Sequence, residues 1–108
     1  MTVQTEKLEN GFRIVTEHMP GLQSASVGVW VDAGGRHERL EQNGIAHFLE
    51  HMLFLGTEKY PEVDEYNNYL HSHKGYSNAY TASENTNYYF EIEHSAFQGA
   101  LDRFSQFF

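Results

Sequence analysis

The stretch His47-Phe48-Leu49-Glu50-His51 decides how the rest of this chain is interpreted. On an α-helix, residues four positions apart lie on the same face, so the imidazoles of His47 and His51 can bind one metal ion together. Glu50 follows His47 by three positions and shares this face, where its carboxylate can polarise a water molecule at the metal. A helix through these residues is therefore predicted to carry most of a hydrolytic metal site.

The pattern H-x-x-E-H is the reverse of the H-E-x-x-H signature of zinc proteases. The flanking residues predict the helix itself, because Asn43-Gly44 is a start signal and Gly56 is a stop signal. A second stripe at helical spacing is apolar and is expected to pack on the core: Ile45, Phe48, Leu49, Met52 and Leu55 or Leu53. The alternative is chance, since the chain is rich in His and Glu. The two-faced pattern, on a helix without lysine, favours the metal site.

Composition restricts the class of protein. The 108 residues are enough for one small domain, and 40% hydrophobic residues predict a folded core rather than disorder. A formal net charge of −8 argues against nucleic acid or an anionic membrane as a partner. No apolar run reaches the length of a membrane span, and residues 1–6 lack both a signal core and a transit pattern. With no cysteine either, we expect a soluble cytoplasmic protein.

The rest of the sequence predicts a mixed fold. Asn10-Gly11 is a hairpin signal, and residues 24–32 alternate between apolar and polar as a half-buried strand does. Pro61 suits the first position of a second helix, and Ser95 to Gln98 suits a capping box before a third. We expect strands at 12–16, 24–32, 76–81 and 86–93, and helices at 44–55, 61–73 and 97–108. This order predicts an α+β fold, a two-layer domain with a mostly antiparallel sheet and helices packed on one face.

The last predicted helix stops in the middle of an amphipathic pattern. Phe104, Phe107 and Phe108 belong to its apolar face, and no cap, glycine or charged tail follows them. We expect these rings to be exposed unless a neighbour covers them. Residues 1–108 are therefore interpreted as a single incomplete N-terminal segment of a longer protein. Asp102-Arg103, on the same helix, is expected to be an exposed and weakly paired couple.

Residues 47–57, HFLEHMLFLGT, resemble the zinc-binding segment of the pitrilysin or insulinase family of metallopeptidases, the inverzincins. The resemblance covers nearly the whole chain. Residues 8–38, LENGFRIVTEHMPGLQSASVGVWVDAGGRHE, are most similar to the mitochondrial processing peptidase branch. Three later segments are most similar to the insulin-degrading branch: KYPEVDEYNNYL at 59–70, GYSNAYTASENTNYYFEI at 75–92 and GALDRFSQFF at 99–108. The resemblance implies the N-terminal domain of such a metallopeptidase, in truncated form.

The resemblance also implies roles for individual residues. His47 and His51 become zinc ligands, and Glu50 becomes the general base that takes a proton from the water attacking a peptide bond. The strand at 77–81 resembles the family strand that binds a peptide substrate by strand addition. The substrate-binding positions carried over to this chain are Phe54, Asn78, Ala79 and Tyr80. The family's third ligand, a glutamate, falls beyond Phe108, so the isolated chain is expected to bind zinc weakly and to show little peptidase activity.

Two functional classes remain open from the sequence. The first is a zinc metalloendopeptidase represented by its catalytic front segment, with a peptide as substrate and the remaining domains of the parent peptidase as partner. The second is a non-catalytic fragment that lacks the third ligand and binds metal, another protein or a second copy of itself. The family resemblance adds the mitochondrial matrix as an alternative to the cytoplasm. No residue of the chain selects among peptides.

Overall fold

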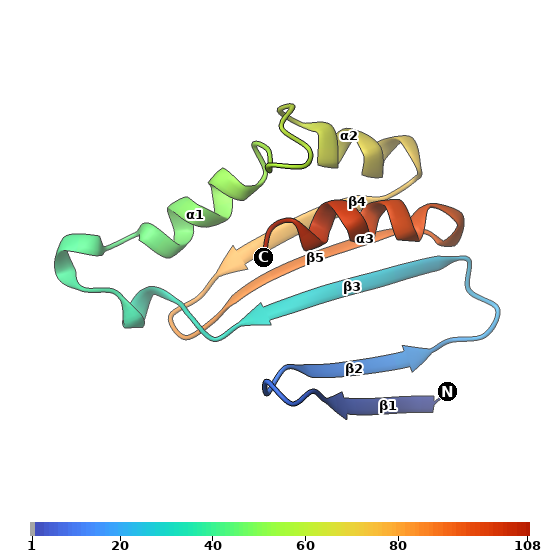
Figure 1. Cartoon of the computed structure of the whole chain (residues 1–108), viewed down its shortest axis with the longest axis horizontal. Helices are drawn as coiled ribbons and strands as arrows, with labels where there is room; N and C mark the ends of the chain where they lie inside the picture. The colour runs from blue at the N-terminus through green and yellow to red at the C-terminus, as the bar shows by residue number, and fades with distance from the viewer. Residues whose placement is uncertain (1) are drawn as a thin grey trace.

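The computed structural model describes residues 2–108, and Met1 lies outside them. These residues form five strands, three α-helices and three short 3₁₀ turns (Figure 1). In chain order the elements are β1 (Thr2–Lys7), β2 (Arg13–His18), β3 (Ser24–Val31), η1 (Gly35–His37), η2 (Leu40–Gln42), α1 (Ile45–Leu53), α2 (Glu65–Ser72), β4 (Tyr76–Thr81), β5 (Thr86–Glu93), η3 (His94–Ala96) and α3 (Phe97–Ser105). None of the helices in the described range is long and apolar enough to cross a membrane.

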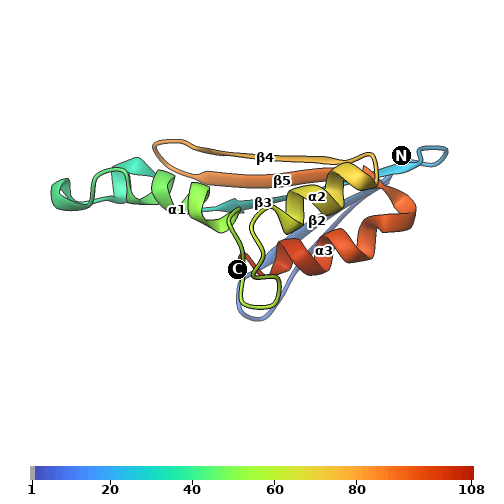
Figure 2. The ribbon, with the colours of Figure 1, turned by 90° about the horizontal axis from the view of Figure 1, so that it is seen from above.

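The strands pair antiparallel throughout and form two separate sheets. β1 and β2 make the hairpin that Asn10-Gly11 predicts, although the sequence does not predict β1 itself, because TVQTEK offers no apolar face. The second sheet has the order β3-β5-β4, so β5 is central and β4 is an edge strand. All three α-helices lie on one side of this sheet (Figure 2). The predicted α+β architecture, with helices on one face of an antiparallel sheet, is therefore confirmed.

The register of the three-stranded sheet places its apolar residues on the helix side. Val27 lies opposite Phe90, and Val29 lies opposite Tyr88, in the β3–β5 pair. Ala79 of β4 flanks Tyr88 from the other side. Because side chains alternate along each strand, these residues all share one face. This confirms the predicted alternation in β3.

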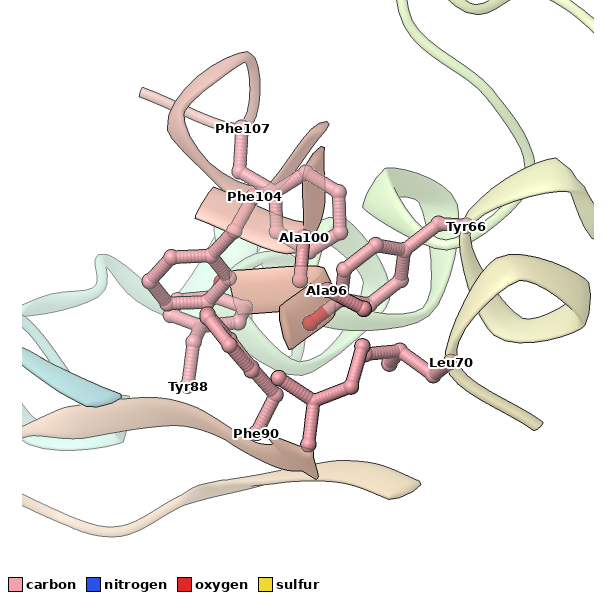
Figure 3. Packing of buried hydrophobic residues seen from close by; sticks show 9 residues of the cluster. Tyr66, Leu70, Tyr88, Phe90, Ala96, Ala100, Phe104 and Phe107 are labelled. Carbon is pink, nitrogen blue, oxygen red and sulfur yellow. The ribbon is translucent and has the colours of Figure 1, made fainter. Parts of the chain in front are cut away.

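The core lies between that face and the helices α2 and α3 (Figure 3). Side chains from the two helices interdigitate with those of β5, and Leu70, Phe90 and Ile92 are almost completely shielded from solvent. The buried cluster consists of Tyr66, Leu70, Tyr88, Phe90, Ile92, Ala96, Ala100, Phe104 and Phe107. The aromatic and branched residues of β5 are typical of a buried strand, whereas the burial of the rings of the last helix was not expected from the sequence.

The aromatic end of the chain differs from expectation. Phe104 is only 2% exposed and Phe107 only 9%, so the expectation that both lie in water is wrong. The Phe107 ring lies 5.1 Å from the Tyr66 ring and 5.2 Å from the Phe54 ring, measured between centroids, in edge-to-face geometry. Such pairs are favourable beyond their buried area. Only Phe108 remains largely exposed, at 59%.

The apolar stripe of α1 also differs from expectation. Phe48 is 63% exposed and Leu49 is 53% exposed, whereas Glu50 is only 9% exposed. The helix has therefore turned its carboxylate, not its apolar stripe, toward the sheet, and contact with the core is made by Leu53 and Phe54. The exposed apolar residues of this segment are Ile45, Phe48, Leu49, Met52 and Leu55.

Two helix starts differ from the predicted ones. α2 begins at Glu65 rather than at Pro61, because Asp64 adopts a left-handed backbone conformation with φ of 67° that interrupts the helix. The predicted capping box at Ser95 is wrong, since η3 occupies that position. Ala96 then precedes α3, and no side chain caps the helix.

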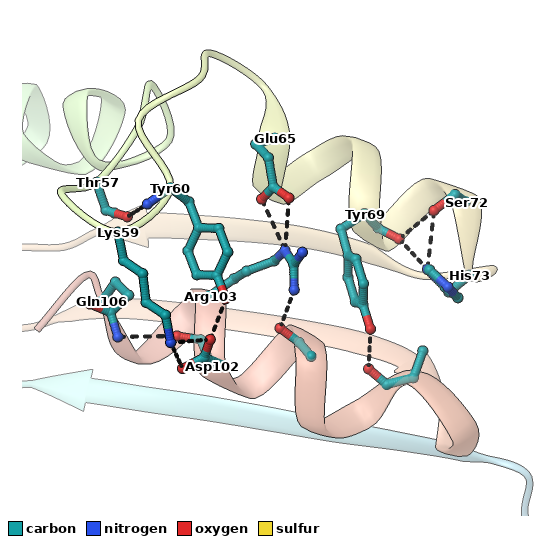
Figure 4. A network of polar contacts seen from close by, with 12 residues as sticks. Thr57, Lys59, Tyr60, Glu65, Tyr69, Ser72, His73, Asp102, Arg103 and Gln106 are labelled. Atoms are coloured by element: carbon teal, nitrogen blue, oxygen red, sulfur yellow. Dashed lines mark hydrogen bonds and ion pairs between the residues drawn. The ribbon is translucent and has the colours of Figure 1, made fainter.

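A cluster of polar contacts joins α3 to α2 and to the loop that follows α1 (Figure 4). The guanidinium of Arg103 contacts both carboxylate oxygens of Glu65 at 3.0 and 2.9 Å. It also lies between two rings, 4.5 Å from the centroid of Tyr60 and 3.9 Å from that of Tyr69. The Arg103 side chain is 17% exposed, so the expectation of a weak surface couple is wrong for this residue.

The neighbouring Asp102 completes this cluster. Its carboxylate accepts hydrogen bonds from Lys59 at 3.0 and 2.8 Å and from the hydroxyl of Tyr60. These donors hold the pKa of the Asp102 carboxyl below its usual range. The Lys59–Asp102 pair is well exposed and contributes little by itself. Its effect is geometric, because it fixes the loop at 57–64 and thus the end of α1.

Replacing Phe104 with alanine should lower the free energy of unfolding by about 3–5 kcal/mol, because the ring is buried among four aromatic neighbours. Phe108→Ala is the matched control and should cost about 1 kcal/mol or less. Urea unfolding followed by circular dichroism measures both. Equal effects of the two substitutions would contradict this account of the core.

Candidate functional site

The two histidines of the H-x-x-E-H pattern meet on the exposed side of α1. Their Nε2 atoms lie 2.9 Å apart, and the ring centroids are separated by 4.7 Å. This distance allows a hydrogen bond between the rings when one nitrogen carries a proton and the other does not, so the donor depends on the tautomer. Both side chains are accessible from solvent. The predicted convergence of His47 and His51 on one point is therefore present in the fold.

The pair has the chemistry and spacing that a metal ion requires. Zinc binds imidazole nitrogens at 2.0–2.1 Å, so two nitrogens of a tetrahedral shell lie about 3.3 Å apart. The observed separation of 2.9 Å is within a few tenths of an ångström of that value. A metal ion bound by both Nε2 atoms would take the place of this ring–ring contact. No group of three or more His, Cys, Asp or Glu side chains that could hold a metal occurs among residues 2–108.

Glu50 lies beside the histidines but points toward the sheet. Its side chain is buried, and its Oε2 accepts a hydrogen bond from the hydroxyl of Thr81 in β4. A buried carboxylate needs such a donor, because an ionised carboxylate without a partner is far more costly to bury than a neutral polar group. Burial raises the pKa of the nearby Tyr88 phenol, and the negative charge of Glu50 raises it further. Glu50 is thus a shielded carboxylate on the same helix as the solvent-exposed histidine pair.

The loop before α1 is anchored to the turn after β4. The backbone N–H groups of Gly35 and Arg36 donate to the carbonyls of Ala82 and Ser83 at 3.1 and 2.9 Å. Gly34 makes this approach possible, because a Cβ atom there would lie 2.2 Å from the carbonyl oxygen of Ala82. Any larger residue at position 34 would therefore push the loop away from the sheet.

From this anchored loop, Glu38 reaches the N-terminus of the motif helix. Its Oε1 accepts a hydrogen bond from Gly44 N–H at 3.0 Å, and its Oε2 accepts one from Ala46 N–H at 2.7 Å. Hydrogen bonds from Ala46 and then Gly44 hold the pKa of the Glu38 carboxyl below its usual range. The carboxylate also faces the positive end of the helix dipole. Glu38 therefore caps the N-terminus of α1 from the preceding loop.

An open cleft lies between α1, the loop before it and the end of β4. It is lined by Gly35, Glu38, Asn43, Gly44, His47, Glu50, Ala79, Tyr80, Thr81, Ala82 and Ser83. The fold thus brings the predicted residues Ala79 and Tyr80 to the same cleft as His47 and Glu50. Asn78 lies on β4 but outside this lining.

Phe54, also predicted to bind substrate, lies elsewhere. Its ring packs between Tyr66 and Phe107, at centroid distances of 6.0 and 5.2 Å, on the core side of α1. It does not line the cleft that contains His47 and Glu50. The helical spacing that relates Phe54 to Glu50 is therefore observed, but both side chains point inward.

Two residues of the site cannot be found from local sequence patterns. Glu38 caps α1 from six positions before Gly44, a spacing outside the usual capping motifs. Thr81 reaches Glu50 across 31 positions, and only the strand register of β4 places it there. The sequence identifies Thr81 only as the last residue of the strand that is expected to bind a peptide.

The chain is similar to known proteins over almost its whole length. The family model described as Insulinase (Peptidase family M16) matches residues 13–108. Insulin-degrading enzyme of Homo sapiens is 45% identical over 102 residues, which are 94% of this chain and 10% of that protein. A-factor-processing enzyme of Saccharomyces cerevisiae is 46% identical over the same share of each chain. The Schizosaccharomyces pombe protein mug138, named as a candidate zinc protease, is 54% identical, again with 94% and 10% covered.

A solved structure has the same fold. The crystal structure of pitrilysin superimposes with a TM-score of 0.90 and 34% sequence identity, covering 98% of this chain and 11% of that one. The chain therefore spans about a tenth of the length of the relatives that it matches. The match with the insulin-degrading enzyme extends over both the front and the later part of the sequence.

Replacing Glu38 with glutamine should destabilise the chain near neutral pH and have little effect in acid. The folded-state pKa of Glu38 is lowered, so its stabilising effect is present above the unfolded pKa and is lost as the pH falls through the folded pKa. Urea unfolding of wild type and variant at pH 7 and near pH 3 measures the difference. Glu41→Gln makes the same chemical change on the neighbouring exposed turn and should behave as wild type. A Glu38→Gln effect that is as large in acid as at pH 7 would argue against a charged cap.

Proposed function

The chain belongs to the insulinase family, peptidase family M16, and from this membership we propose that it is the N-terminal catalytic segment of a zinc metalloendopeptidase. The observation that carries the proposal is the arrangement on α1, where two imidazole nitrogens 2.9 Å apart lie beside a buried carboxylate. Accessible metal ligands next to a shielded carboxylate are what metal-assisted hydrolysis needs.

In this proposal His47 and His51 hold zinc through their Nε2 atoms. Bound zinc would supply Lewis-acid polarisation of the peptide carbonyl and would lower the pKa of a water molecule. Neutral imidazole is a good zinc ligand, although copper and nickel also bind a histidine pair. A catalytic zinc site usually has a third protein ligand. Because no such cluster is found among residues 2–108, that ligand would come from another part of the parent polypeptide.

Glu50 acts as the general base. Its carboxylate accepts a proton from the water that attacks the peptide carbonyl. The hydrogen bond from Thr81 engages Oε2, so the carboxylate has a fixed orientation before substrate arrives. Preorganised groups lower the barrier, because no reorganisation is needed during the reaction.

The substrate is a peptide that docks along β4. This strand is at the edge of its sheet, so its outer backbone groups have no strand partner among the described residues. An extended peptide can pair with such an edge, while side-chain pockets set the preference for sequence. Asn78, Ala79 and Tyr80 lie on this strand, and the last two line the cleft beside Glu50. Phe54 would contribute only indirectly, by supporting α1 from the core side.

The exposed apolar stripe of α1 is where the remaining domains of the parent peptidase would pack. Phe48 and Leu49 are both more than half exposed, and neighbouring apolar residues extend the patch. Apolar patches of this kind usually mark an interface. A second copy of the chain is the alternative occupant when the chain is studied alone.

Zinc should bind the 108-residue chain weakly and only through the histidine pair. Titration calorimetry should detect binding to wild type and lose it in the His47→Ala, His51→Ala double variant, because the two ligands are removed. The matched control is the His18→Ala, His71→Ala double variant, which removes two other exposed histidines. It should bind zinc as the wild type does. Equal zinc binding by the two double variants would rule out the proposed ligands.

Glu50→Gln in the complete polypeptide should reduce turnover of a quenched fluorogenic peptide by at least about a hundredfold. Zinc content and folding should be retained, because glutamine has nearly the same size and can still accept the hydrogen bond from Thr81. The 108-residue chain is assayed in parallel and should show little activity, since it lacks a third ligand and the surfaces that exclude water. Full activity of the zinc-loaded variant would assign the base to another residue. An inactive wild-type polypeptide that binds zinc would favour the non-catalytic alternative.

A further inference from the structure

We propose that Thr81 is a positioning residue for Glu50 and that it couples the base to the strand on which the peptide docks. This inference rests on the proposed function, because it assigns Glu50 the role of base and β4 the role of docking edge. It goes beyond that function by naming a residue that neither binds the metal nor takes a proton. The observation behind it is the single hydrogen bond that joins α1 to β4 at the cleft.

Thr81 is the one hydrogen-bond donor that reaches the Glu50 carboxylate within residues 2–108. The Thr81 side chain is half-buried and lies on the helix side of β4, while Glu50 approaches it from α1. The carboxylate of a residue only 9% exposed has few water molecules available as substitutes. Without the hydroxyl, Glu50 would rotate toward solvent or remain unpaired. Its orientation therefore depends on Thr81.

The position of Thr81 is itself tightly fixed by the sheet. It pairs directly with Thr86 of β5, and the Thr86 hydroxyl donates to the carbonyl of Ala33 at 2.8 Å. The turn that follows is closed by a hydrogen bond from Ala82 N–H to the Asn85 carbonyl at 2.8 Å. The hydroxyl of Thr81 thus projects from a strand end that is held by its pairing with β5 and by the closed turn that follows. A β-branched side chain adds further restriction, because its χ1 angle is limited.

Docking of a peptide would act on the same strand. Backbone pairing along the free edge of β4 would add hydrogen bonds to the strand from Asn78 to Thr81, and the Thr81 hydroxyl links this strand to Glu50. The base would then be held most firmly when a peptide occupies the edge. Loss of the hydroxyl should therefore affect the chemical step more than the binding of peptide. This separates a positioning role from a role in substrate affinity.

The test compares Thr81→Val with Thr81→Ser in the complete polypeptide. Valine keeps the shape and removes the donor, whereas serine keeps the donor. We expect Thr81→Val to lower kcat by about ten- to hundredfold with little change in KM, and Thr81→Ser to retain most of the activity. Thr86→Val is the matched control, since it removes the facing hydroxyl, which contacts Ala33 and not Glu50. Its kcat should fall much less.

A second measurement needs neither metal nor activity. In the metal-free 108-residue chain, the ¹³C resonance of the Glu50 side-chain carboxyl, assigned with Glu50→Gln, should shift in Thr81→Val and return toward its original position in Thr81→Ser. An unchanged resonance in Thr81→Val would overturn the inference. A kcat of Thr81→Val equal to that of wild type would also overturn it, and so would an equal loss of kcat in Thr86→Val. An inactive wild-type polypeptide would instead refute the proposed function, which is a different and separately visible failure.

Discussion

The burial of one carboxylate, that of Glu50, sets the orientation of the motif helix. A charged group inside the protein must be paired, and Thr81 provides the hydrogen bond. Once Glu50 faces the sheet, helical geometry places His51 one position further around the axis and His47 on the turn before. Both histidine side chains then face solvent. The accessible histidine pair and the shielded carboxylate are thus two consequences of one rotational setting of α1.

A closed set of contacts maintains this setting. Glu38 holds the N-terminus of α1, and the same loop is anchored to the turn after β4 through Gly35 and Arg36. Thr81 connects that turn's strand back to the middle of the helix. Each contact is modest alone, with a typical hydrogen bond worth about 1 kcal/mol net. Together they fix the helix relative to the edge strand from two directions.

The aromatic core supports the other end of α1. Phe54 packs on Phe107, and the cluster around Arg103 and Asp102 fixes the loop that leads away from the helix. These contacts lie on the core side, and the apolar stripe of α1 is left largely exposed among residues 2–108. The helix is therefore stable in its orientation while still presenting a large surface to a neighbour.

The sequence by itself determined those helices and strands that are predicted by residues close together in the chain. The H-x-x-E-H spacing placed two imidazoles and a carboxylate together on α1, and the period-2 pattern of β3 and the bounds of β4 and β5 were confirmed. These features depend on residues a few positions apart, and helix or strand geometry relates such residues directly. The resemblance to the insulinase family rests on the same motifs and is confirmed by the family match.

Only the tertiary structure decided which face of α1 is buried. An amphipathic pattern shows that a helix has two faces, but the choice depends on what lies opposite. Here the partner of Glu50 is Thr81, brought near by pairing of β4 with β5. The burial of Phe107 and the stacking of Arg103 between two tyrosines are likewise contacts between segments far apart in the chain. Long-range pairing leaves no periodic trace in either partner's sequence, so these parts of the site and core became visible only in the folded chain.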